Sequence, residues 1–296
     1  MTVTVLGATG KTGGTATDRL LAAGVKVKAV GRSPEKLAAL QKRGAQAIVA
    51  DVDDAGALTD AFRGSDGVYL MIPADITKPD VVGQYARAGE AMARAVRDAG
   101  VRRAVLLSSV GAEVAAGTGP IAGLHAVEAG LRAIEGLALT ILRPGYFYEN
   151  YYATLGLIKQ QGINGGAIDP DLALPTIAAA DVGSAAAEAL LGANAAGVVV
   201  RELTGPRDLT PTEATRLIGK AIGKPGLPYL RFPDDGYLKG LESAGIHPDA
   251  ARLFLEMAQS FNKGVVHPQP GNEKVRTATT FESFADGYAQ AYRAAP

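Results

Sequence analysis

The chain has 296 residues, of which 30 are basic and 30 acidic, and it contains no cysteine. A net charge of zero provides no field that could hold a polyanion, so we expect no direct binding of nucleic acid. The missing cysteines exclude disulfides, thiolate metal sites and cysteine nucleophiles, and the three scattered histidines predict no metal site. We recognise neither a secretory leader nor an apolar stretch of membrane-spanning length, and therefore expect a cytoplasmic protein with no membrane contact.

Short apolar segments alternate with longer amphipathic segments through the first half of the chain, which is the pattern of βαβ units. The strands predicted in chain order are Thr2–Leu6, Lys26–Val30, Ala47–Ala50, Gly67–Ile72, Ala104–Ser108 and Ala138–Leu142. The helices predicted between them are Lys11–Ala23, Pro34–Lys42, Asp54–Phe62, Asp80–Ala99 and Ile121–Ile134. This order predicts an α/β fold with a doubly wound parallel sheet of the Rossmann type.

The regular alternation weakens after Pro144, where an aromatic segment is followed by glycine- and proline-rich stretches. Helices are predicted near Ala180–Leu191, Thr212–Ala221, Pro248–Ser260 and Phe281–Ala294, and strands at Val198–Thr204 and Leu227–Arg231. We therefore expect a sheet domain over residues 1–150 and a smaller, mostly helical C-terminal lobe over residues 151–296. This division leaves room for the chain to cross back to the sheet near residues 180–205.

A glycine-rich turn, Gly7-Ala8-Thr9-Gly10-Lys11-Thr12-Gly13, joins the first predicted strand to the first predicted helix. Gly7 permits the tight turn, Gly10 lets the backbone approach a diphosphate, and Gly13 allows close packing of the helix on the strand. The N–H groups and the positive dipole end of the helix then face the phosphates. The turn predicts an NAD(P)-binding domain at residues 1–150, in which Gly7, Thr9, Gly10, Lys11, Thr12 and Gly13 contact the dinucleotide. The alternative is a glycine-rich turn that binds nothing.

The end of the second predicted strand distinguishes between the two nicotinamide dinucleotides. An NAD-specific site usually places Asp or Glu there to accept from the ribose 2′-hydroxyl. This chain reads Val30-Gly31-Arg32-Ser33-Pro34-Glu35-Lys36 instead, so Arg32 and Lys36 are available for a 2′-phosphate. We expect NADP(H), with NAD(H) as the second choice, unless Arg32 is only a solvated charge at a helix start. Asp51 is expected either to accept from the adenine amino group or to act as a turn or helix-capping acid.

Further segments resemble a known family. They are Gly31–Lys36, Leu107-Ser108-Ser109-Val110-Gly111-Ala112 and Leu142-Arg143-Pro144-Gly145-Tyr146-Phe147-Tyr148-Glu149-Asn150, with weaker matches at Ala180–Gly183 and Leu203–Pro206. Together with the glycine turn they resemble the NmrA-like proteins, atypical members of the extended short-chain dehydrogenase/reductase superfamily. The resemblance implies NADP(H) binding, with the nicotinamide end near Ser108, Ser109 and the Pro144–Phe147 loop. The further cofactor contacts expected are Ile72, Pro73, Ser108, Pro144, Gly145, Tyr146 and Phe147.

The Tyr-x-x-x-Lys pair of typical short-chain reductases is absent from this chain. Pro120 stands at the tyrosine position and Leu124 at the lysine position. An unactivated ketone loses about 10²–10⁴-fold in rate without a placed acid. We therefore expect an NAD(P)H-dependent oxidoreductase whose small-molecule substrate is electron-poor: a quinone, an azo compound, an activated carbonyl or an imine. The alternative is a non-catalytic NADP(H)-sensing regulator that binds a partner protein, and an oligomer stays open.

Three side chains are candidates for catalysis. His125 is a candidate proton donor, or else a helix-start residue that bonds a loop. Ser109 would hold substrate or nicotinamide through its hydroxyl, or else end its strand. Tyr146 opens a cluster of five aromatic residues in seven positions, which would face a planar acceptor or fill the core of the second lobe.

The residues after Tyr146 supply the expected substrate contacts. These are Tyr148, Asn150 and Tyr151, of which Asn150 could instead cap the following helix. Glu128 with Arg132, one helical turn apart, and also Arg143 and Asp181 are expected to be structural.

Overall fold

The computed structural model describes residues 1–193 and 197–295, and the centre of this part is a sheet of eight parallel strands. Their order is β12-β10-β6-β5-β4-β1-β2-β3. The strands are β1 (Thr2–Leu6), β2 (Lys26–Gly31), β3 (Gln46–Val49), β4 (Gly67–Leu70), β5 (Arg103–Leu107), β6 (Ala138–Pro144), β10 (Val198–Thr204) and β12 (Glu273–Arg276). The first six strands run in the order 3-2-1-4-5-6, so the predicted Rossmann-type fold is confirmed.

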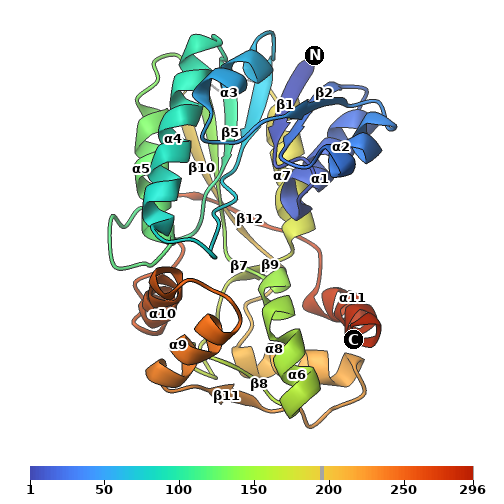
Figure 1. The fold of residues 1–296 in the computed structure, drawn as a ribbon, viewed down its shortest axis with the longest axis vertical. Helices are drawn as coiled ribbons and strands as arrows, with labels where there is room; N and C mark the ends of the chain where they lie inside the picture. The colour runs from blue at the N-terminus through green and yellow to red at the C-terminus, as the bar shows by residue number, and fades with distance from the viewer. Residues whose placement is uncertain (194–196, 296) are drawn as a thin grey trace.

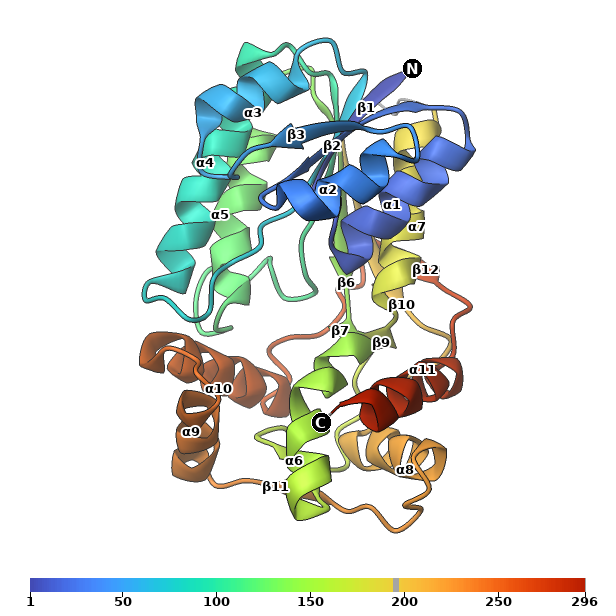
Figure 2. The same ribbon diagram turned by 45° about the vertical axis from the view of Figure 1, so that its right-hand side comes forward.

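Helices cover both faces of this sheet (Figures 1 and 2). On one face lie α1 (Lys11–Ala22), α2 (Pro34–Gln41) and α7 (Ala179–Leu191), and on the other α3 (Ala55–Phe62), α4 (Val81–Asp98) and α5 (Ile121–Arg132). Successive side chains of a strand point to opposite faces of the sheet. The strands between these layers are apolar on both sides because helices cover both faces. In β1, for example, Val3 and Val5 enter the core beneath α1, whereas Leu6 enters the core beneath α3 and α4.

After Pro144 the chain builds a second lobe, which lies below the sheet in Figure 1. Its helices are η1 (Tyr148–Thr154, a 3₁₀ helix), α6 (Leu155–Gln161), α8 (Pro211–Ala221), α9 (Asp234–Ser243), α10 (Pro248–Asn262) and α11 (Phe281–Ala294). Two short parallel pairs support them: β7 (Tyr146–Phe147) with β9 (Thr176–Ile177), and β8 (Asn164–Gly166) with β11 (Tyr229–Arg231). No helix in the described ranges is both long and apolar enough to pass through a membrane.

The chain returns twice from this lobe to the sheet. The first return is α7 with β10, in the region where the sequence left room for one. The second return, β12, was not predicted, because an edge strand that reads Glu-Lys-Val-Arg and is mostly exposed has no apolar alternation. Residues beyond 150 therefore build part of the sheet domain as well as the second lobe, so the expected boundary at residue 150 does not separate the two lobes.

Candidate cofactor and acceptor site

The glycine-rich turn has the backbone geometry that a diphosphate needs. Gly7 adopts φ +60°, a conformation that side chains disfavour, and a Cβ on Gly13 would collide with the carbonyl of Gly7. Helix α1 begins at Lys11, and Gly10 before it provides no side-chain cap, so the first N–H groups of the helix have no side-chain acceptor among the described residues. This uncapped helix start on a glycine-rich turn fits the diphosphate of a dinucleotide.

The side chains of the turn have separate contacts. The Thr12 hydroxyl is buried and accepts a hydrogen bond of 3.0 Å from the Tyr69 hydroxyl, so this side chain is committed to β4. The ammonium of Lys11 lies 4.7 Å from the centre of the Tyr152 ring, which joins the turn to the second lobe. Thr9 is exposed and lies beside Gly31, at the end of β2.

A cavity of about 410 Å³, which we call the charged cavity, lies beyond the ends of β2, β3 and β4. Arg32, Asp51, Ile72 and Pro73 line it, together with further aspartates and basic residues, whereas Lys36 does not. Asp54 rather than Asp51 caps helix α3, where its carboxylate accepts from the Ala57 N–H at 2.9 Å. Asp51 is therefore not the helix cap and remains available to a ligand.

Arg32 differs from the other cations of the charged cavity. Arg87 donates to Asp80 at 3.0 Å, and the Lys78 ammonium lies 3.4 Å from Asp75. The exposed guanidinium of Arg32 has no such anion within the described residues. It is thus the lining cation best placed to take an anion from outside the protein.

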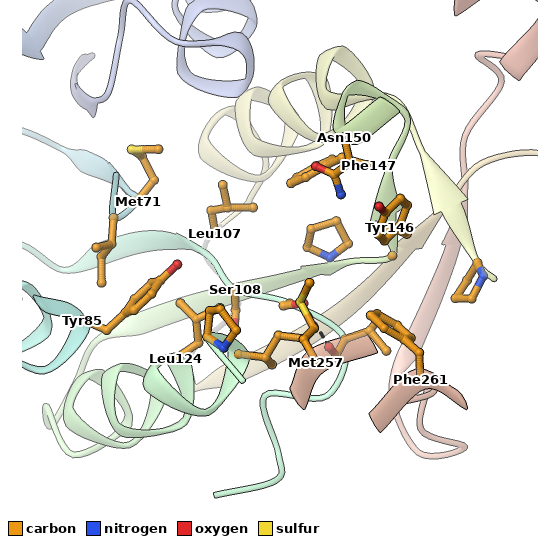
Figure 3. Close-up of a pocket in the computed structure, with 18 of the residues that line it drawn as sticks. Met71, Tyr85, Leu107, Ser108, Leu124, Tyr146, Phe147, Asn150, Met257 and Phe261 are labelled. Carbon is orange, nitrogen blue, oxygen red and sulfur yellow. Dashed lines mark hydrogen bonds between the residues drawn. The ribbon is translucent and has the colours of Figure 1, made fainter. Parts of the chain in front are cut away.

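A second cavity, of about 360 Å³, lies at the carboxyl ends of β4, β5 and β6, and we call it the uncharged cavity (Figure 3). None of the described residues that line it carries a charge. It brings together eight of the predicted site residues: Ile72, Ser108, Ser109, Pro144, Gly145, Tyr146, Phe147 and Asn150. Ile72 also lines the charged cavity, so the two cavities meet at that residue.

A buried ion-pair network supports the wall of the uncharged cavity. The Ser108 hydroxyl donates to Glu128 at 2.6 Å, and Arg143 donates to the same carboxylate at 2.9 and 2.7 Å. Burial raises the pKa of Glu128, but the hydrogen bonds from Arg143 and Ser108 outweigh it and hold the pKa below its ordinary value. Glu128 also lies 3.3 Å from Arg132, and a third oxygen partner of Arg143 is Glu113, at 2.7 Å. These charges hold β5, β6 and α5 together beneath the wall, and the Ser108 hydroxyl is committed to them.

The candidate catalytic residues are placed differently from one another. Ser109 lines the uncharged cavity, with its hydroxyl donating to the Val110 carbonyl at 2.9 Å. His125 does not line it: the ring nitrogen Nδ1 lies 3.0 Å from the carbonyl oxygen of Ala112, which is the geometry of a residue that bonds a loop. The catalytic role expected of His125 therefore has no support in its position.

The aromatic segment after β6 divides between cavity and core. Tyr146 and Phe147 line the uncharged cavity, whereas Tyr148 is buried in the core of the second lobe and donates to the Thr279 carbonyl at 3.1 Å. Tyr151 is also mostly buried and packs edge-on against Tyr146, with ring centres 6.1 Å apart. Burial raises the pKa of the Tyr146 hydroxyl well above its usual value, and Tyr237 and Tyr229 add to the shift. Tyr146 is thus a neutral phenol at any ordinary pH.

Tyr85 is a lining residue that sequence reasoning missed. It lies on α4, and its ring occupies the space that a side chain at Gly123 of α5 would fill. Its hydroxyl is directed toward the cavity in Figure 3 and has no hydrogen-bond partner among the described residues. Burial raises the pKa of this phenol. Only the glycine opposite it hinted at a close contact, and a glycine in a helix does not reveal its neighbour.

Comparison with known proteins finds relatives that are named as quinone and azo reductases. It is 27% identical over 266 residues to quinone oxidoreductase 2 of Escherichia coli, covering 88% of each chain, and 26% identical to the NAD(P)H azoreductase of Xenophilus azovorans, covering 99% of this chain and 100% of the relative. The crystal structure of the Escherichia coli NADPH-dependent quinone oxidoreductase in complex with NADPH superimposes with a TM-score of 0.79 at 25% identity, covering 97% and 99% of the two chains. NmrA, a negative transcriptional regulator solved with NAD, shares the fold at 18% identity and a TM-score of 0.73. The NmrA-like family model matches residues 1–285, and the chain therefore belongs to the NmrA-like family.

Proposed function

We propose that the protein is an NADPH-dependent reductase that acts on a small, uncharged, electron-poor acceptor in the uncharged cavity. The observation that carries the proposal is the meeting of two unlike cavities at Ile72, one with an unpaired arginine and the other without any charge. NADPH has two ends of the same kinds, since its adenosine phosphate is anionic and its reduced nicotinamide ring carries no charge. Similarity to a quinone oxidoreductase and to an azoreductase supports the same reading.

The residues that would hold NADPH follow from the two cavities. The backbone from Gly7 to Gly13 would hold the diphosphate, Arg32 the 2′-phosphate, and the loop from Pro144 to Phe147 the nicotinamide end. When bound, NADPH supplies a hydride from C4 of its nicotinamide, and a quinone that accepts this hydride takes up one proton to become the hydroquinone.

The lining side chains define what the acceptor must be. Pro120 and Leu124, at the positions of the missing dyad, both line the cavity, and no lysine among the lining residues lowers the pKa of a tyrosine there. Burial instead raises the pKa of both Tyr85 and Tyr146, so these phenols donate hydrogen bonds but are weak acids. Quinones, azo compounds, activated carbonyls and imines tolerate such a site because their reduced forms can take the proton from water.

Tyr85 has the best position for binding the acceptor oxygen. Its hydroxyl faces the cavity and is not committed to another described residue, unlike the Ser108 hydroxyl, which donates to Glu128. We assign to Tyr85 the hydrogen bond that orients an acceptor carbonyl. The surrounding apolar side chains lower the local dielectric constant and thereby strengthen this bond.

A screen of acceptors tests the proposed function. Purified protein is mixed with NADPH and a panel of quinones, azo dyes, aldehydes, imines and simple ketones, and NADPH oxidation is followed by its absorbance. We expect oxidation coupled to the electron-poor acceptors, with simple ketones inert. Tight NADPH binding, measured by calorimetry, without turnover of any acceptor would contradict the proposal and favour the NADP(H)-sensing regulator instead.

A further inference from the structure

A third cavity, which we call the second chamber, lies in the C-terminal lobe next to the uncharged cavity. Its volume is about 680 Å³, and its walls come from η1, α6, β8, β11, α9 and α10. It shares Tyr146, Asn150, Phe254 and Met257 with the uncharged cavity. These four side chains thus border both cavities, with the end of β6 on one side and the interior of the second lobe on the other.

The chamber is lined by aromatic rings and lacks charge. Six rings face it: Tyr146, Tyr151, Tyr229, Phe232, Tyr237 and Phe254. No Asp, Glu, Lys, Arg or His is among its described lining residues. Burial raises the pKa of the Tyr229 and Tyr237 phenols, so these side chains also stay neutral. Edge and face contacts with such rings favour another aromatic ring, and a charged group would lose its hydration without gaining a partner.

The uncharged cavity alone is small for its proposed task. Sites for small molecules occupy about 300–1,000 Å³. At about 360 Å³ the uncharged cavity must hold the nicotinamide end of the cofactor as well as the acceptor. An acceptor larger than a single ring therefore has to extend past these four shared side chains, toward the second chamber.

We propose that the second chamber binds a second aromatic ring of the acceptor, so that the preferred substrates are uncharged molecules with two rings. The reducible ring lies in the uncharged cavity, and the other ring lies among the six aromatic side chains beyond Tyr146. This inference rests on the proposed function for the identity of the reducible ring. The binding of the second ring, in contrast, follows from the chamber itself.

A matched pair of quinones tests this proposal. Methyl-benzoquinone and benzyl-benzoquinone have similar reducible rings and differ by one phenyl group. Binding of each is measured by calorimetry to the protein saturated with NADP⁺, where no turnover occurs. Burial of the phenyl group predicts that the benzyl compound binds about ten- to hundredfold more tightly. Equal affinity for the two quinones would overturn the proposal.

Two glycines that line the chamber have room for a larger side chain. A Cβ on Gly240 of α9 or on Gly156 of α6 meets no atom within 4 Å, and both residues line the chamber. In Gly240→Leu and Gly156→Leu we expect the advantage of the benzyl compound to shrink, with methyl-benzoquinone binding unchanged. Gly130→Leu is the matched control, since Gly130 is also helical with open space around its Cβ but lies outside the chamber. Retention of the full benzyl advantage in both chamber variants would contradict the assignment.

A charged ligand shows whether the phenyl ring is buried in the second chamber or only contacts the protein surface. A benzyl-benzoquinone that carries a sulfonate on the phenyl ring should bind no more tightly than methyl-benzoquinone, because the chamber offers no cation. Binding as tight as that of the neutral benzyl compound would place the ring in solvent and overturn the proposal. Steady-state assays with NADPH then distinguish the two claims: if neither quinone is reduced, the proposed function fails, whereas the binding ratios still decide whether the chamber takes a ring.

Discussion

The charged and uncharged cavities meet at Ile72, yet their chemistry is opposite. The charged cavity is lined by three cations and several aspartates. Two of the cations form ion pairs, and only Arg32 has no anionic partner among the described residues. None of the described residues that line the uncharged cavity is charged. The charged side chains of Glu128 and Arg143 lie behind the lining residue Ser108 and form an ion pair with each other. Under the proposed function, the unpaired Arg32 would select an anionic group and the uncharged cavity an uncharged ring.

The largest expected effect comes from disturbing the buried pair beneath the uncharged cavity. Glu128→Ala would leave Arg143 buried without its main partner, and removal of one member of such a pair costs about 3–5 kcal/mol of folding stability. Urea unfolding measures the loss. Asp18→Ala, which breaks an exposed pair with Arg43, is the control and should cost less than about 1 kcal/mol. Similar small losses in both variants would show that this buried pair does not stabilise the fold.

The same pair makes stability depend on acid. Because the folded pKa of Glu128 lies below its ordinary value, its contribution is present above the ordinary glutamate pKa of about 4.3 and is lost as pH falls through the lower folded pKa. Urea midpoints of the wild type and of Glu128→Gln should therefore converge as the solution is acidified. A constant difference between them down to the acid transition would contradict the assignment.

The next effect concerns the unpaired cation of the charged cavity. A charge-assisted bond contributes about 1.5–3 kcal/mol, so Arg32→Ala should lower the preference for NADPH over NADH by tenfold or more. The measurement is the ratio of the two dissociation constants. Arg87→Ala removes a cation of the same cavity that is paired with Asp80, and should leave the ratio nearly unchanged. If Arg32→Ala keeps the full preference for NADPH over NADH, Arg32 does not bind the 2′-phosphate.

Loss of the close backbone contact in the glycine turn should weaken dinucleotide binding by a similar amount. Gly13→Ala places a Cβ against the backbone of Gly7, and overpacking of this kind costs about 1–3 kcal/mol. We expect weaker binding of both NADPH and NADH, because the diphosphate is common to them. Gly14→Ala is the control, since its Cβ meets only the Ala8 carbonyl at an ordinary 3.5 Å. Equal binding by the two variants would show that the close approach at Gly13 is not needed.

The smallest expected effect is at the unpaired phenol of the uncharged cavity. Loss of one neutral hydrogen bond corresponds to about 0.5–1.5 kcal/mol, so Tyr85→Phe should lower kcat/KM for a quinone a few-fold. NADPH affinity should not change. Tyr292→Phe, which alters a phenol outside the cavity, serves as the control. If Tyr85→Phe leaves kcat/KM for every quinone unchanged, the phenol does not orient the acceptor.

The parts of this molecule that the sequence could predict are those encoded locally. The first six strands, the glycine turn and Arg32 each follow from a short pattern, and in the structure the turn and Arg32 directly follow the carboxyl ends of β1 and β2. The Glu128–Arg132 contact follows from helical spacing in the same way. Short or exposed elements, such as β8 with its Asn-Gly-Gly sequence and the edge strand β12, carry no such pattern.

The lining of the uncharged cavity is harder to predict because it depends on which face a helix presents. Leu124 lines the cavity, but one residue later the helix has turned by about 100°, and His125 contacts Ala112 instead. Tyr85 on α4, and Met257 and Phe261 on α10, come from helices far apart in the sequence. Their meeting is set by how the lobes pack, which no local pattern describes.

Single-turnover hydride transfer tests the central claim most directly. Protein loaded with NADPH is mixed rapidly with one equivalent of methyl-benzoquinone, and the same experiment is repeated with NADPH that carries deuterium on either face of C4. We predict that NADPH is oxidised one-to-one with quinone reduction, and that deuterium on only one face slows the step. Bound NADPH that stays reduced in the presence of the quinone would contradict the account.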